Sequence, residues 1–279
     1  IFYALSQHDL VPRYDGTNWD VCRYTELSIA MGSNWGANSN FDCYIYNDGG
    51  TLRLVTGAAW TSDTARNESL TRLNGRWTNN ASMTGRYSNS ATVTVAANQG
   101  LYVGSFRTTG STGTTTWEIA GSAANGDPGL LYLWNLYNRV PVSIRCSETT
   151  DSWTYGGNGT WQATNNSTTN RITFLRGLNE DGIIGAAWCN MQPALSTTAI
   201  VGIGLDSTTV PGGTMMASSG LGVSNRSMGS AMYNGVPGLG LHFITGLETV
   251  NSASAATWEG DTTGGGAFTQ QGLTYYGYH

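Results

Sequence analysis

Hydrophobic and polar side chains alternate along much of this chain, in short runs that end in turn residues. The clearest run is Phe41–Val55, in which Phe41, Cys43 and Ile45 occupy every second position. Residues 47–50 (Asn-Asp-Gly-Gly) tolerate a positive φ, and the alternation resumes after them. A period of two that is interrupted by such a turn predicts a β-hairpin over this segment.

Further strand-like runs follow at a spacing of about ten residues, which is typical of all-β domains. The run Leu101–Phe106 comes directly after Ala91–Val95 and a short turn, so we expect these two runs to form a second hairpin. The other predicted strands are Val21–Met31, Leu130–Ile144, Trp153–Tyr155, a strand signal at Trp161, Arg171–Leu175, Ile183–Cys189, Thr198–Leu205, Leu239–Val250 and Gly272–Tyr278.

Only Ser62–Leu73 has the features of a helix. It begins with Ser and Asp, places Leu70 and Leu73 about one turn apart, and is followed by Asn74 and Gly75 as a stop signal. We expect one or two turns here and almost no helix elsewhere. Because parallel strands need long crossover connections that are mostly helical, this scarcity favours antiparallel sheets.

A Gly/Thr-rich stretch, residues 108–116, is too polar to pack and indicates a domain boundary near Arg107. The sequence therefore predicts an all-β protein with very little helix, made of two antiparallel β-sandwich or jelly-roll-like domains. We expect residues 1–107 to form an N-terminal β domain and residues 108–279 a C-terminal sandwich.

The same alternation predicts which side chains face a core. In Thr198–Leu205, Gly202 and Gly204 leave one face bare, which indicates a close-packed neighbour. The aromatic- and arginine-rich Trp134–Tyr155 is expected to form two core strands joined by an irregular bend. The predicted core residues are Ile45, Val93, Trp134, Val201 and Phe243.

Composition narrows the possible functions. Charged residues make up 11 % of the 279 residues, all 13 basic residues are arginine, and the formal net charge is −5. The arginines are scattered singly among acids, whereas nucleic-acid binders carry a basic patch, so we expect no nucleic-acid partner. No run of about 18 apolar residues occurs, which argues against a membrane span.

Cysteine and histidine show no metal-site spacing. The four cysteines allow three pairings if they are oxidised, but we favour free buried thiols because Cys43 and Cys146 lie in apolar runs. His8, His242 and His279 lie far apart. We expect no metal site and no cofactor.

Paired carboxylates could hydrolyse a glycan, and three pairs are close in sequence. Glu180–Asp181 lies in an Asn-Glu-Asp-Gly run that is typical of a turn. Glu148 with Asp151, and Glu259 with Asp261, also lie in predicted loops. We therefore expect no catalytic residue and no enzyme activity.

Ten Trp and 14 Tyr are unusual in a chain so poor in charge. Aromatic rings beside amides and carboxylates are typical of carbohydrate-binding surfaces, although most aromatic residues of a sandwich are core. Trp35, Trp153, Trp161 and Trp258 lie in predicted polar loops, and we expect these four to be exposed.

The chain ends on Leu273–His279, which is aromatic and carries no acidic or basic tail. We expect this segment to be held in a sheet, with neighbouring tyrosines on opposite faces, so that one ring enters the core and the other contacts a second copy or a glycan. The candidate contact residues are Tyr275, Tyr276, Tyr278, Trp153 and Trp161.

Several segments carry a family likeness. The stretches are LVPRYDGTNW, ELSIAM, FDCYIYNDGGTLRL, AAWTSDTARNESLTRLNGRW, LYVGSFRTTG, LWNLYNRVPVSIRCSETTDSWTY, VGIGLDSTT and GLHFITGLE. Together they resemble a group of tailed-bacteriophage virion proteins described as tail-fibre, head-fibre or capsid-associated proteins. The likeness is weak in residues 112–129 and 211–236.

This resemblance implies a β-rich structural protein that is exposed on the virion, associates with copies of itself and with other virion proteins, and contributes to attachment to host-surface glycan. It transfers no catalytic residue. Two alternatives remain open. One is a glycan-degrading tailspike-type enzyme, and the other is a free carbohydrate-binding, lectin-like module.

Overall fold

The computed structural model describes residues 1–4, 9–123, 126–214, 216–219, 226–261 and 271–279. Strands joined by turns and loops make up this part of the chain, which contains no α-helix; its 3-10 turn η2 spans Thr164–Asn166. No helix in the described residues is long and apolar enough to cross a membrane. The predicted all-β fold is therefore confirmed.

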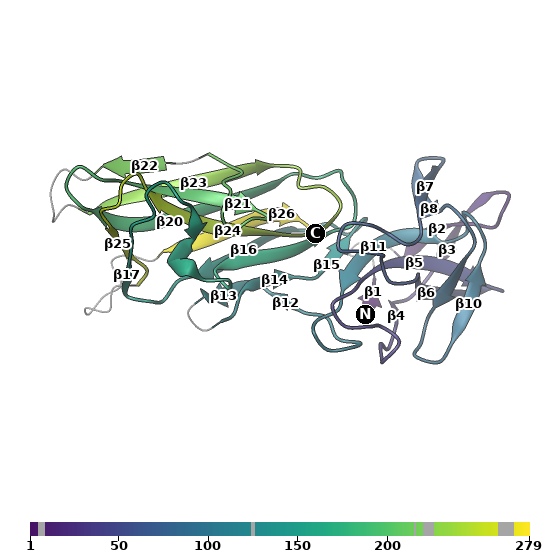
Figure 1. The fold of residues 1–279 in the computed structure, drawn as a ribbon. Coiled ribbons are helices and arrows are strands. Elements are labelled where there is room, and N and C mark those ends of the chain that lie inside the picture. Colours follow the sequence, from purple (N-terminus) through teal and green to yellow (C-terminus); the bar gives the residue numbers. More distant parts are fainter. Residues whose placement is uncertain (5–8, 124–125, 215, 220–225, 262–270) are drawn as a thin grey trace.

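Figure 1 shows two β-rich units side by side, and the C-terminus lies where they meet. We call β1–β11 together with β15 the N-terminal unit, because β15 pairs with β11. The remaining strands form the C-terminal sandwich.

The N-terminal unit is built on one eight-stranded sheet in the order β10-β9-β6-β5-β11-β8-β7, with β15 attached to β11. Alternate residues of its strands enter two clusters, one on each face: Ile45 and Val103 belong to the first, and Tyr44 and Tyr102 to the second. Two small sheets, β1–β4 and β2–β3, supply further residues of the first cluster. The strands are β1 (Phe2–Tyr3), β2 (Leu10–Tyr14), β3 (Trp19–Arg23), β4 (Leu27–Ser28), β5 (Asn40–Asp48), β6 (Thr51–Thr56), β7 (Leu70–Leu73), β8 (Arg76–Asn79), β9 (Met83–Arg86), β10 (Thr92–Val95), β11 (Leu101–Arg107) and β15 (Leu133–Asn135).

The C-terminal sandwich consists of two seven-stranded sheets. The first has the order β12-β14-β19-β24-β21-β22, with β18 on β24, and the second has the order β13-β16-β26-β20-β25-β17, with β23 on β20. Most pairs are antiparallel, but β13–β16 and β14–β19 are parallel. The strands are β12 (Trp117–Glu118), β13 (Ala120–Ser122), β14 (Gly129–Leu131), β16 (Pro141–Ser147), β17 (Ser152–Tyr155), β18 (Gln162–Ala163), β19 (Arg171–Arg176), β20 (Ile183–Pro193), β21 (Thr198–Leu205), β22 (Met216–Ser219), β23 (Ser227–Gly235), β24 (Gly240–Val250), β25 (Ala256–Glu259) and β26 (Gly272–Tyr278).

One buried cluster lies between the two sheets of the sandwich. Phe174 and Ile244 come from the first sheet, and Ile144, Ala187 and Tyr275 come from the second. Every second residue of β20 and β26 points into this core, and the residues between them form an outer surface. We call this surface, on the second sheet, the outer face.

The first predicted hairpin is confirmed, because β5 and β6 pair in register around Gly49 and Gly50, both at positive φ. The second hairpin prediction is wrong: β10 pairs with β9, whereas β11 pairs with β5. Buried Asn79 explains the difference. Its side-chain nitrogen donates to the Ala96 carbonyl (2.8 Å) and its side-chain oxygen accepts from the Gly100 backbone N–H (2.8 Å), which holds the connecting loop against β8.

The predicted helix over Ser62–Leu73 is also wrong. Its second half is strand β7, which pairs with β8 across Asn74 and Gly75. Both residues have positive φ (49° and 84°), as a two-residue hairpin turn of the Asn-Gly type requires. The pair that we interpreted as a helix stop is therefore a hairpin turn.

The predicted core is partly confirmed. Ile45, Trp134 and Val201 are buried, whereas Val93 is only half-buried. Phe243 was assigned to the wrong phase, because Ile244 faces the core and Phe243 lies on the other side of β24. The bare glycine positions of β21 do have a close neighbour: a Cβ on Gly202 would lie 2.8 Å from the Trp161 ring, and one on Gly204 would lie 2.2 Å from the Ser207 carbonyl.

The boundary near Arg107 stays a prediction. Strand β11 ends there, yet β15 returns to pair with it. The Arg107 guanidinium donates to the Asn40 side-chain oxygen (2.9 Å) and to a carboxylate oxygen of Asp63 (2.6 Å). The Asp63 carbonyl in turn accepts from the Leu241 backbone N–H of the sandwich (2.9 Å), so the connection extends across both units.

Gly104 should tolerate no side chain. A Cβ there would lie 2.4 Å from the Trp134 carbonyl oxygen, where β15 crosses a bulge in β11. We expect Gly104→Ala to lower the free energy of unfolding by about 1–3 kcal/mol, because β15 must move away. Exposed Gly110 has no atom within 4 Å of its Cβ position, so Gly110→Ala is the control and should change stability by less than about 0.5 kcal/mol. Equal urea midpoints for the two variants would show that the contact between β11 and β15 is not tight.

Candidate functional site

An arginine whose side chain is only 10 % exposed joins the two units. Arg66, in the loop between β6 and β7, donates to Asp42 on β5 (2.6 Å) and to the Tyr102 hydroxyl on β11 (3.1 Å). Its guanidinium also donates to the carbonyl of Gly177, which lies in the sandwich after β19. The Ser105 hydroxyl completes the carboxylate shell with a 2.6 Å hydrogen bond to Asp42. In this four-residue network of the N-terminal unit, Arg66 and Tyr102 both donate to one backbone carbonyl of the sandwich.

The charge of Arg66 is fixed by its surroundings. Burial lowers the pKa of its guanidinium, but the adjacent Asp42 carboxylate and the Tyr102 hydroxyl outweigh burial and raise that pKa. Arg66 therefore stays a cation. The ring of Trp60 also lies under the guanidinium, 4.8 Å from its carbon to the ring centroid.

A second set of ion pairs crosses the junction at the turn after β19. Asp181 pairs with Arg139 and with buried Arg176 (3.3 Å). Glu180 pairs with Arg72 of the N-terminal unit (2.6 Å). Glu180 and Asp181 lie in the predicted turn, and both form ion pairs with arginines of this chain.

The C-terminal strand docks as predicted, through β26 and His279. Nδ1 of buried His279 donates to the Leu133 carbonyl (3.2 Å), and Nε2 accepts from the Tyr275 hydroxyl. Burial and, next, the nearby Arg176 cation lower the pKa of His279 to about 3, so its ring is neutral. Backbone hydrogen bonds of 2.8 and 3.0 Å tie His279 to Val140.

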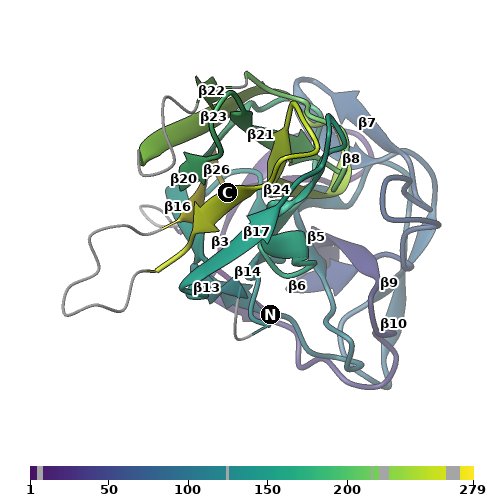
Figure 2. The same cartoon turned by 60° about the vertical axis from the view of Figure 1, so that its left-hand side comes forward.

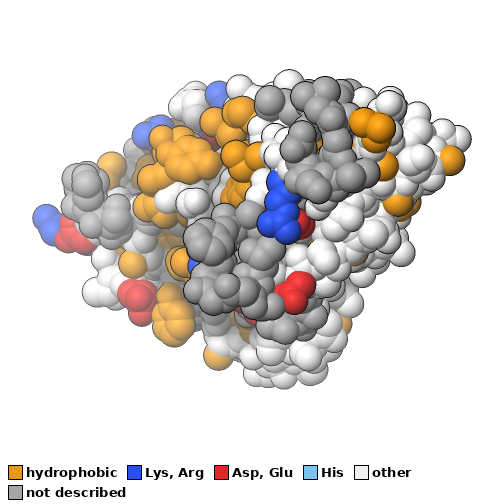
Figure 3. Space-filling view, turned by 90° about the vertical axis from the view of Figure 1, so that its left-hand side faces the viewer, with side chains coloured by type: hydrophobic (Ala, Val, Ile, Leu, Met, Phe, Trp, Pro, Cys, Tyr) orange, Lys and Arg blue, Asp and Glu red, His pale blue; other side chains and the backbone are white. Residues whose placement is uncertain are grey.

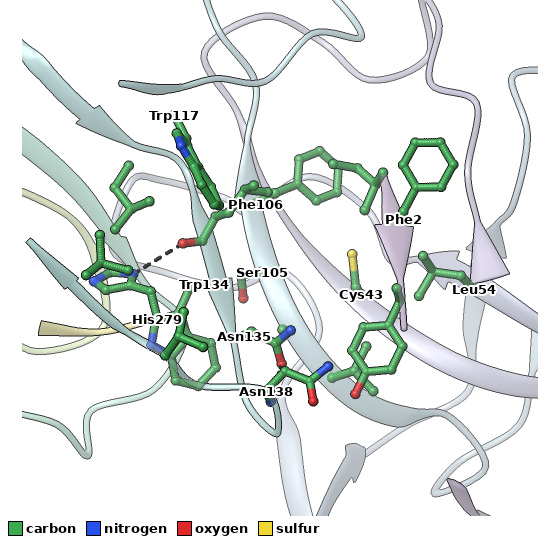
Figure 4. Close-up of a pocket in the computed structure, with 18 residues that line it drawn as sticks. Phe2, Cys43, Leu54, Ser105, Phe106, Trp117, Trp134, Asn135, Asn138 and His279 are labelled. Carbon is green, nitrogen blue, oxygen red and sulfur yellow. Dashed lines mark hydrogen bonds between the residues drawn. The ribbon is translucent and has the colours of Figure 1, made fainter. Parts of the chain in front are cut away.

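A cleft of about 210 Å³ opens beside this anchor (Figure 4). Its walls are mostly apolar, and Phe2 (73 % exposed) and Trp117 (58 % exposed) lie on it. The polar side chains on its wall have partners within the protein: Asn135 accepts from two backbone N–H groups, Ser105 bonds Asp42, and His279 bonds Leu133. The cleft therefore offers apolar contact area. Its apolar lining includes Leu54, Val103, Phe106, Leu131, Leu133 and Val142.

The predicted alternation at the C-terminus is confirmed. Tyr275 is fully buried in the sandwich core, whereas Tyr276 (42 % exposed) and Tyr278 (47 % exposed) lie on the outer face. These two rings contact each other edge to face, with centroids 6.1 Å apart. The prediction that Tyr275 contacts a partner is therefore wrong, because its ring is not accessible. Tyr276 and Tyr278 remain candidates.

The tryptophan expectations were partly wrong. Trp35 and Trp258 are fully buried, because the Trp35 ring N–H donates to the Thr56 hydroxyl (3.0 Å) and Trp258 lies on β25 in the sandwich core. Trp153 and Trp161 are only half-buried. Both rings also contact other parts of this chain. The Trp153 ring N–H donates to the buried Glu248 carboxylate, and the Trp161 ring packs against Gly202 of β21. Contact with a partner stays a prediction for both.

That buried carboxylate, Glu248, was missed from the sequence. It occupies an inward position of β24 and accepts from the ring N–H of Trp153 (2.9 Å), the amide of Gln162 (2.7 Å) and the backbone N–H of Asn165 (3.2 Å). Burial raises the pKa of Glu248 to about 7, although these hydrogen bonds oppose the shift. A carboxylate in the apolar phase of a strand gives no distinctive sequence signal.

The prediction that Glu148 and Glu259 lie in solvent-exposed loops is wrong. Glu148 is fully buried, and Glu259 lies on β25 with 3 % exposure, paired with Arg226 (2.8 Å). Neither is a solvated loop residue. Both lie near the thiol of Cys189, whose pKa is raised by burial and by the neighbouring carboxylates. The cysteines are free, as expected. No group of three or more His, Cys, Asp or Glu in the described residues is arranged to hold a metal ion, and His8 lies outside those residues.

No protein-family model and no curated protein matches this chain.

Removing the buried cation should destabilise the whole chain. Arg66→Met leaves Asp42 as an unpaired buried charge, so we expect a loss of about 3–5 kcal/mol in the free energy of unfolding. Arg23 forms a solvent-exposed pair with Asp9, and Arg23→Met is the control, with an expected loss below about 1 kcal/mol. Urea titration of both variants checks this. Similar losses for the two variants would contradict a special role for Arg66.

Glu248→Gln should remove a pH dependence of stability. Because the pKa of Glu248 is raised from 4.5 to about 7 by folding, the folded chain holds this proton more tightly than the unfolded chain. The resulting stabilisation is present in full below pH 4.5 and is lost as the pH rises to 7. Relative to the variant, the parent should lose up to about 3 kcal/mol over this range.

Urea titrations of parent and variant at several pH values measure this difference. His279 has the opposite effect, because its lowered pKa makes acidification destabilising, but that effect is common to both proteins and cancels. A difference between parent and variant that is constant with pH would show that folding does not shift the pKa of Glu248.

Proposed function

We propose that this protein is a structural component of a tailed-bacteriophage particle, exposed on its surface as a tail fibre, head fibre or capsid decoration. In this proposal it acts without catalysing a reaction. It associates with copies of itself and with other virion proteins, and it contributes to attachment to the host surface, where glycan is the candidate receptor.

The main support for this proposal is that three of the segments that resemble phage virion proteins contact one another in the folded chain. Asp42 comes from FDCYIYNDGGTLRL, Arg66 from AAWTSDTARNESLTRLNGRW, and Tyr102 with Ser105 from LYVGSFRTTG. These stretches are far apart in the sequence, yet their side chains build one buried network at the junction. Arg139, which pairs with Asp181 beside it, comes from LWNLYNRVPVSIRCSETTDSWTY.

A buried network that fixes two β units against each other suits a structural role. It offers no open site to a substrate, since Asp42 is 1 % exposed and Arg66 is satisfied by the protein. The carboxylates Glu148 and Glu259 are also buried, which argues against a glycan-degrading enzyme that uses them. The solvent-accessible features are the apolar cleft and the outer face, both of which suit contact with other macromolecules.

Mass spectrometry of gradient-purified particles of a phage that encodes this chain tests the proposal. We expect the chain to co-purify with the particles at a fixed copy number, and antibodies raised against it to label intact particles in electron micrographs. A chain found only in the soluble fraction of the lysate would overturn the proposal. Release of reducing sugar from host polysaccharide that Glu148→Gln or Glu259→Gln abolishes would instead support the glycan-degrading enzyme.

A further inference from the structure

The outer face of the sandwich carries an apolar band that runs across three adjacent strands. On β26, Tyr276 and Tyr278 point outward, and Tyr276 lies directly opposite Ile184 of β20. Two residues further along β20, Ala186 lies opposite Met232 of β23. Because residues that are paired across a sheet share a face, these side chains form one continuous surface.

The band continues along β20. A Cβ on Gly272 would lie 2.4 Å from the ring of Trp188, so this ring lies flat across the glycine on the outer face. The adjacent pair places Met228, 68 % exposed, opposite Asn190. Hydrophobic side chains gather on the left-hand part of Figure 3, the side on which β16 and β26 lie in Figure 2.

Charge is absent from the middle of this band. None of its positions from Tyr278 to Met228 carries an acid or a base, and the nearest charged positions across the sheet are Arg145, on β16, and Glu259, which is already paired with Arg226. Tyr, Trp and Met without acidic neighbours are the composition of protein–protein interface cores. A sugar site needs planar polar groups beside its aromatic rings, whereas the strand neighbours of these rings are Ser143 and Pro141 of β16 and Ile184 of β20.

The exposure of the band also points to a protein partner. Its most exposed large apolar side chains are 42 % to 68 % exposed, from Ile184 and Tyr276 to Met228. Apolar side chains that are exposed together in one patch are typical of protein–protein contact surfaces. A second copy of this chain fits best, because an uncharged band that meets itself across a two-fold axis brings no like charges together.

We propose that two copies of this chain associate through their outer faces, with Tyr276, Ile184 and Met232 at the centre of the contact. The proposal deepens the proposed function, since it assigns a surface to the association of copies in a particle. Association of the purified chain can nevertheless fail while the chain is still found in particles, so the two proposals are tested separately.

Sedimentation velocity of the purified chain over a range of micromolar concentrations tests this interface. The parent should sediment as a dimer, and Ile184→Asp and Tyr276→Asp should each weaken association by about tenfold or more, because each places two like charges across the contact. Tyr137 is similarly exposed (44 %) but lies near the junction, so Tyr137→Asp is the control and should associate like the parent.

Circular dichroism and melting temperature establish that each variant is folded, and Met232→Lys replaces any variant that is not. A parent that remains monomeric, or face variants that associate like the parent, would overturn the proposal. A monomeric parent that binds host polysaccharide, with binding lost in Tyr276→Ser, would assign the outer face to a glycan and overturn it as well.

Discussion

The contact between Arg66 and the Gly177 carbonyl is the constraint on which the arrangement of the two units depends. Three hydrogen-bond partners surround one buried cation, and Asp42 supplies its counter-charge from a central strand. Only glycine fits at position 177, because a Cβ there would lie 2.2 Å from the Trp134 ring and 2.3 Å from the Tyr102 hydroxyl. The close approach of a bare backbone thus allows a polar network to form beside the hydrophobic contact of Leu178 with Tyr102 and Trp134.

Other features of the junction follow from that approach. The turn after β19 brings Asp181 within reach of Arg139 and Arg176. Arg176 lies beside His279, so the end of β26 is fixed where the units meet. With β26 anchored at this end, its outward tyrosines take fixed positions on the outer face, and the cleft keeps its apolar walls. A rigid junction therefore determines which surfaces the protein presents to a partner.

Local sequence signals predicted the fold class and failed where long-range contacts decide. The alternation in Phe41–Val55 is complete within the segment, so its hairpin was predictable. Asn74-Gly75 ends helices and also turns hairpins, and only the pairing of β7 with β8 distinguishes the two. Arg66 and Gly177 are 111 residues apart, so no local pattern could indicate their contact. Glu248 is an acid at an inward position of β24, where hydrophobic alternation predicts an apolar side chain, so the pattern could not identify it as buried.

Hydrogen exchange during urea unfolding tests most directly whether the buried network makes the two units one cooperative body. Amides of β5 and β11 report on the N-terminal unit, and amides of β24 and β26 report on the sandwich. We predict that both sets lose protection at the same urea concentration in the parent, and that Asp42→Asn separates the two transitions. Two well-separated transitions in the parent would contradict this account, because the units would then be held together without depending on each other.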